Sequence, residues 1–109
     1  MNFRDFLKQQ LETDPEFRRE WEALEPAFQV VCTLIETRNR LGWTQAELAR
    51  QMGTTQASVS RVESTGQVTP EFLARFAAAV GGRATLLLDL PGREQLPIAM
   101  ETLAKRRAA

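Results

Sequence analysis

Residues 41–66 read LGWTQAELARQMGTTQASVSRVESTG, and this stretch decides the fold. Thr44 and Glu47 have the spacing of a capping box, which predicts that a helix begins directly after Thr44. Gly53 predicts a turn, and Gly66 predicts the end of a second helix. Two short helices joined by such a turn pack at a defined angle, and the second then fits the DNA major groove, which is about 12 Å wide.

The flanking sequence predicts further helices on both sides. A helix over Pro26 to Leu41 presents Val31 and Leu34 to the core, and a helix over Pro70 to Val80 buries aromatic and small residues. Together these segments define a mainly α DNA-binding domain at residues 26–82.

Residues 41–63, continued by TPEFLARFAAAVG at residues 69–81, resemble the XRE family of helix-turn-helix regulators, to which lambdoid phage repressors belong. The resemblance implies a five-helix, lambda-repressor-like domain that binds double-stranded operator DNA. It implies that Gln45 contacts a phosphate and braces the second helix, that Thr55, Gln56, Ala57 and Arg61 face the groove, and that Thr54, Ser60, Arg38 and Arg40 contact phosphates. Other roles stay open: Gln45 and Thr55 as helix-start residues only, and Arg61 as an ion-pair partner of Glu63 or Glu47.

Residues 1–25 form an acidic helical extension, with four basic against seven acidic residues. Its aromatic side chains are Phe3, Phe6, Phe17 and Trp21. With the Asp14-Pro15-Glu16-Phe17 start, the Leu24-Glu25-Pro26 junction and an apolar run after Gly81, the chain is similar to HigA-type antitoxins. That similarity implies a cognate RelE/HigB-like RNase toxin as partner. Two interpretations of the aromatic residues remain: toxin binding, or packing over the helix that starts at Pro26.

Residues 83–90 predict one short strand, with Leu86 and Leu88 on one face and Leu87 on the other. A lone strand leaves its backbone groups unpaired, so the same strand of a second subunit is the expected partner and the protein is expected to be a homodimer. Residues 91–109 are expected to form a tail with a loose helix from Pro97 onward.

Composition excludes several function classes. The chain has no histidine and one cysteine, Cys32, so no zinc site, His-based catalytic site, cofactor or internal disulfide is expected, and Cys32 is expected to be a small buried residue. No apolar run is long enough to cross a membrane, which favours a cytoplasmic protein.

The function expected from these patterns is that of an antitoxin that represses its own operon and neutralises an RNase toxin. The alternatives are a stand-alone XRE-family repressor and an interaction module with a vestigial DNA-binding unit. An enzyme is not expected.

Overall fold

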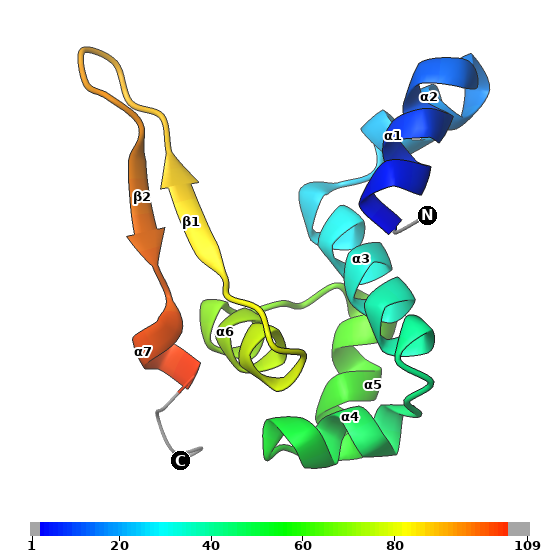
Figure 1. Cartoon of the computed structure of the whole chain (residues 1–109), viewed down its shortest axis with the longest axis vertical. Helices are drawn as coiled ribbons and strands as arrows, with labels where there is room; N and C mark the ends of the chain where they lie inside the picture. The colour runs from blue at the N-terminus through cyan, green and yellow to red at the C-terminus, as the bar shows by residue number, and fades with distance from the viewer. Residues whose placement is uncertain (1–2, 105–109) are drawn as a thin grey trace.

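The computed structural model describes the backbone of residues 3–104 and the side chains of residues 5–104. Within that range the chain forms seven helices and a two-stranded sheet (Figure 1). The elements are α1 (Phe3–Thr13), α2 (Pro15–Ala23), α3 (Pro26–Arg40), α4 (Gln45–Met52), α5 (Gln56–Thr65), α6 (Pro70–Ala79), β1 (Thr85–Leu88), β2 (Leu96–Ala99) and α7 (Glu101–Ala104).

Side-chain caps set the starts of four helices. Asp14 and the threonines at positions 44, 55 and 69 each accept a hydrogen bond from the backbone N–H three residues later. The capping box is only half formed, because the Glu47 carboxylate accepts hydrogen bonds from Arg50 and Gln51 instead of turning back to Thr44.

Two glycines end the helices that form the central unit. Gly53 ends α4 with φ 70° and Gly66 ends α5 with φ 74°, a left-handed conformation that favours glycine. Gly66 is also buried under Phe28, since a Cβ at this position would lie 3.4 Å from Phe28 Cε1. The turn and the stop predicted from the sequence are therefore confirmed.

The core lies among α3, α4, α5 and α6. Its most deeply buried side chains are Leu48 and Val59, which are 1% and 0% exposed. The other buried members are Val31, Leu34, Ala49, Met52, Val62, Phe72 and Phe76. Residues 26–82 thus hold four helices, and the five-helix arrangement expected from the resemblance is not confirmed.

The prediction of a lone strand was wrong. β1 pairs with β2 of the same chain, antiparallel, with Leu86 opposite Ile98 and Leu88 opposite Leu96. The second strand was missed because Pro97 lies in it, and a proline argues against a strand unless it lies on an edge. In place of a loose helix from Pro97, the chain forms β2 and then the short α7, which packs against α6.

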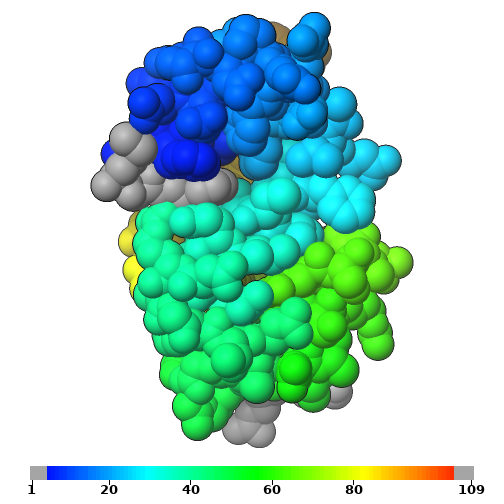
Figure 2. Space-filling model, turned by 90° about the vertical axis from the view of Figure 1, so that its right-hand side faces the viewer, coloured from blue at the N-terminus to red at the C-terminus, as the bar shows by residue number. Residues whose placement is uncertain are grey.

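Helix α3 connects the two ends of the molecule (Figures 1 and 2). α1 and α2 form a helical pair that contacts α3 near its start, whereas α4 and the start of α5 lie at the opposite end. The β-hairpin projects from the region of α6 and α7 (Figure 1). Within residues 3–104 there is no helix of the length and apolar character that a membrane span requires.

Candidate nucleic-acid interface

The outer face of α5 carries the side chains expected to contact DNA bases. Val59 and Val62 turn into the core, while Gln56, Ala57 and Arg61 are exposed on the opposite side. Ser60 is half-buried. The predicted groove-facing residues are therefore brought together on one face. Thr55 is exposed beside them, but its hydroxyl oxygen accepts the Ser58 N–H at 3.1 Å, so it acts as the helix cap.

Arg61 is exposed at the centre of this face. The ion pairs that would have occupied its guanidinium group are not formed: Glu63 pairs with Arg38, and Glu47 pairs with Arg50. No ion pair to Arg61 occurs among residues 5–104. Its charge is thus available to a ligand that approaches α5 from solvent.

A polar clamp holds α5 against α3 and α4. Arg38 Nε and Nη2 donate to the two Glu63 carboxylate oxygens at 2.9 and 3.0 Å, and Arg38 Nη1 donates to the Trp43 carbonyl at 2.8 Å. Gln45 Nε2 donates to Glu63 Oε1 at 3.1 Å. The Arg38 and Glu63 side chains are only 13% and 8% exposed, so the pair is largely shielded from water.

This clamp changes the interpretation of two predicted DNA-contact residues. All three guanidinium nitrogens of Arg38 are used inside the protein, which makes Arg38 a positioning residue for α5 rather than a free phosphate ligand. Gln45 has the bracing role that the resemblance implied for it. No local pattern indicates the Arg38–Glu63 pair, because 25 positions separate the two residues.

Arg40 differs from Arg38. It forms an exposed pair with Glu36, one helical turn away, and its side chain is 46% exposed. Arg50 likewise pairs with Glu47, and hydrogen bonds from Arg50 and Gln51 lower the pKa of the Glu47 carboxyl group. A surface pair of this kind exchanges easily, so Arg40 remains able to contact a phosphate.

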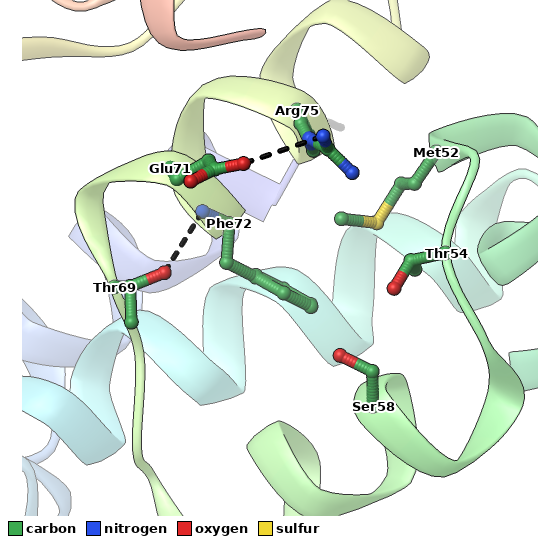
Figure 3. A pocket seen from close by; sticks show the side chains of 7 residues that line it. All are labelled: Met52, Thr54, Ser58, Thr69, Glu71, Phe72 and Arg75. Carbon is green, nitrogen blue, oxygen red and sulfur yellow. Dashed lines mark hydrogen bonds and ion pairs between the residues drawn. The ribbon is translucent and has the colours of Figure 1, made fainter. Parts of the chain in front are cut away.

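Thr54 lies beside a cavity of about 240 Å³ behind the turn between α4 and α5 (Figure 3). Its hydroxyl and that of Ser58 point toward this cavity, whose far side is formed by Phe72 and by the Glu71–Arg75 ion pair (Figure 3). Thr54 is half-buried there and does not share the exposed outer face of α5.

A second candidate site lies on the N-terminal helices. An apolar groove of about 410 Å³ lies between the α1–α2 pair and α3, and it includes three of the predicted partner-binding residues. We call it the N-terminal groove; its lining residues are Phe6, Leu7, Phe17, Glu20, Trp21, Leu24 and Cys32. The side chain of the fourth, Phe3, lies outside the described residues.

The aromatic residues of the N-terminal groove pack partly on one another and remain partly accessible. The rings of Phe17 and Trp21 stack, with centroids 6.4 Å apart and planes inclined by 17°. Phe6 is 46% exposed, and no residue of α2 is buried. Gln29 ties α2 to α3 by donating to the Trp21 carbonyl at 3.0 Å. The helices thus pack on α3 and still leave apolar surface open, and toxin binding by this surface stays a prediction.

The prediction that Cys32 is a buried residue was wrong. It is exposed and lines the N-terminal groove, although its neighbour Val31 is buried. Adjacent residues of a helix point about 100° apart, so the apolar neighbours of Cys32 do not share its direction. Leu24 was not among the predicted partner-binding residues. It follows α2 directly and lines the groove together with Phe17 and Trp21.

The comparisons with known proteins bear on the α3–β1 segment. A family model described as a helix-turn-helix domain matches residues 29–90, which are 62 of the 109 residues. No curated protein and no solved structure matches the chain. The matched region includes α4, α5 and the clamp.

Proposed function

This chain belongs to the helix-turn-helix domain family and is a DNA-binding transcriptional regulator, and on that premise we propose that it represses a promoter by binding a palindromic operator as a dimer. The observation that carries the proposal is the outer face of α5, where Arg61 and Gln56 are exposed and their side chains have no partner among residues 5–104, while a shielded clamp fixes the helix. The proposal assigns the chain no catalytic step.

Four residues of the interface have defined chemical roles in the proposal. Arg61 donates two hydrogen bonds to a guanine edge, and Gln56 pairs with adenine. Ser60 and Arg40 contact phosphates, which position the domain without reading sequence. The amino end of α5 adds favourable partial charge for a phosphate.

Arg61→Ala is expected to weaken operator binding by about 1–3 kcal/mol and to relax the preference at one base pair of each half-site. Arg40→Ala serves as the matched control, because loss of a phosphate contact weakens all sequences alike. The operator is first selected from random DNA with the unaltered protein, and binding is then measured by mobility shift on every single-base variant. An Arg61→Ala protein that binds the selected operator as tightly as the parent would overturn the assignment.

The β-hairpin supports the dimer. Leu86, Leu87, Leu96 and Ile98 are between 39% and 55% exposed, and a two-stranded hairpin alone is marginally stable in water. A second subunit would cover these side chains. It would also supply a second recognition helix for a half-site about 34 Å away.

The N-terminal groove supports a second activity, neutralisation of a RelE/HigB-like RNase toxin. Toxins that bind RNA carry basic surfaces, so an acidic helical pair attracts them, and exposed aromatic residues provide the buried contact. The α1–α2 pair that lines the groove lies at the end of α3 away from α4 and the start of α5, so the proposal allows both partners to bind together (Figure 1). The alternative is a stand-alone repressor. An adjacent gene that encodes a small basic protein favours the antitoxin, and the absence of such a gene favours the stand-alone repressor.

A further inference from the structure

The hydrogen-bonding pattern of the β-hairpin determines which backbone groups remain open. Met100 N donates to the Ala84 carbonyl at 3.1 Å, and these two residues lie opposite each other in the register of the sheet. Hydrogen-bonded and non-hydrogen-bonded pairs alternate along an antiparallel ladder. Leu86 therefore bonds with Ile98, while the N–H and C=O groups of Thr85 and Leu87 point away from β2.

The two outer edges of the hairpin are not equivalent. By the same alternation, Pro97 and Ala99 face the outer edge of β2, and Pro97 has no N–H to offer. A proline at such a position protects a strand edge against further pairing. The outer edge of β1 has no proline: Thr85 and Leu87 each present a donor and an acceptor, and neither makes a backbone hydrogen bond outside the ladder within residues 3–104.

We propose that the outer edge of β1 pairs with the same edge of a second copy of this chain, which gives a four-stranded sheet in the order β2-β1-β1-β2. This inference rests on the proposed dimer and names its contact. Thr85 of each copy lies opposite Leu87 of the other, so the pair makes four backbone hydrogen bonds. An antiparallel edge is self-complementary under a two-fold axis, which is why a second copy fits it.

The side chains agree with this pairing. Leu86, Leu88, Leu96 and Ile98 share one face of the hairpin, and Leu86 is 48% exposed. Pairing around a two-fold axis at Leu86 places the two Leu86 side chains side by side and joins both apolar faces into one surface. A sheet of four strands with a continuous apolar face is more stable than an isolated hairpin.

Two matched proline variants of the full chain test the proposal by sedimentation equilibrium. Leu87→Pro removes an outward N–H from the β1 edge, and Ala99→Pro removes one from the β2 edge, while both leave the internal ladder intact. We expect dimerisation to weaken about tenfold to a hundredfold for Leu87→Pro, because two of the four bonds are lost, and to stay unchanged for Ala99→Pro. Equal weakening in both variants, or none in Leu87→Pro, overturns the edge assignment.

Amide hydrogen exchange of the unaltered chain gives an independent readout. The proposal expects the Thr85 and Leu87 amides to be protected in the dimer and to lose that protection on dilution, while the Ala99 amide exchanges quickly throughout. A stable dimer with an unprotected Leu87 amide refutes the β1 edge and leaves the proposed operator-binding dimer standing. A chain that is monomeric at every concentration and binds single half-sites refutes the dimer itself, together with this inference.

Discussion

Glu63→Ala is expected to lower the free energy of unfolding by about 3–5 kcal/mol, the range typical when one partner of a shielded ion pair is removed. The Arg38 guanidinium group, 13% exposed, then keeps its charge and its bond to the Trp43 carbonyl but loses both carboxylate acceptors. For a domain of this size that loss corresponds to a fall of more than about 10 °C in melting temperature. Thermal unfolding followed by circular dichroism measures it.

Arg40→Ala is the matched control for this experiment. Its pair with Glu36 has similar distances, with both carboxylate oxygens 3.0 Å from Arg40 Nη2, but it uses one nitrogen and is exposed. The expected loss is only about 0.3–0.5 kcal/mol. A Glu63→Ala protein that melts within the range of Arg40→Ala would show that the clamp adds little to stability.

A double variant separates stability from positioning. Replacing the clamp by Arg38→Met with Glu63→Leu leaves no uncompensated charge and is expected to recover much of the lost stability. Operator affinity is expected to stay below that of the parent, because Gln45 and the Trp43 carbonyl lose the groups that align α5 with α4. Full recovery of both properties would assign the clamp to folding alone.

Alkylation of Cys32 with a bulky maleimide is expected to abolish capture of the basic product of the adjacent gene. Cys32 is the single cysteine of the chain, is exposed and lines the N-terminal groove, so the reagent modifies one site and occupies the space proposed for the partner. Operator binding is expected to remain unchanged, since α4 and the start of α5 lie at the other end of α3 (Figure 1). Calorimetry with the purified partner and a mobility shift measure the two activities.

Substitution of a groove residue tests the same surface without a reagent. Phe6→Ala removes a half-exposed aromatic ring of the groove, which is expected to weaken partner binding by about 2 kcal/mol or more if the ring is an anchor. Leu41→Ala removes a similarly exposed apolar side chain outside the groove and is expected to have no effect. If the chain still binds the partner after Cys32 alkylation and after Phe6→Ala, the partner site lies elsewhere. If the unaltered chain does not bind the partner, a stand-alone repressor is supported.

The sequence by itself determined the central helical unit. Thr44 caps α4 as predicted, Asp14, Thr55 and Thr69 cap three further helices, and Gly53 ends α4 in the left-handed conformation. These features depend on interactions within about four residues, so local patterns contain the necessary information. The outer face of α5 follows in the same way, because Val59 and Val62 define the inner face of a helix and leave Arg61 outside.

Only the tertiary structure decided how distant residues combine. Arg38 and Glu63 have no local signature as a pair, and either could have been an exposed charge until α3 and α5 packed together. β2 forms because β1 pairs with it. Pro97 is acceptable in a strand only on an outer edge, and the pairing with β1 leaves it on such an edge. Cys32 lines a groove because α1 and α2 return to α3. In each case the deciding free energy comes from burial and pairing between elements, which no periodicity within one segment encodes.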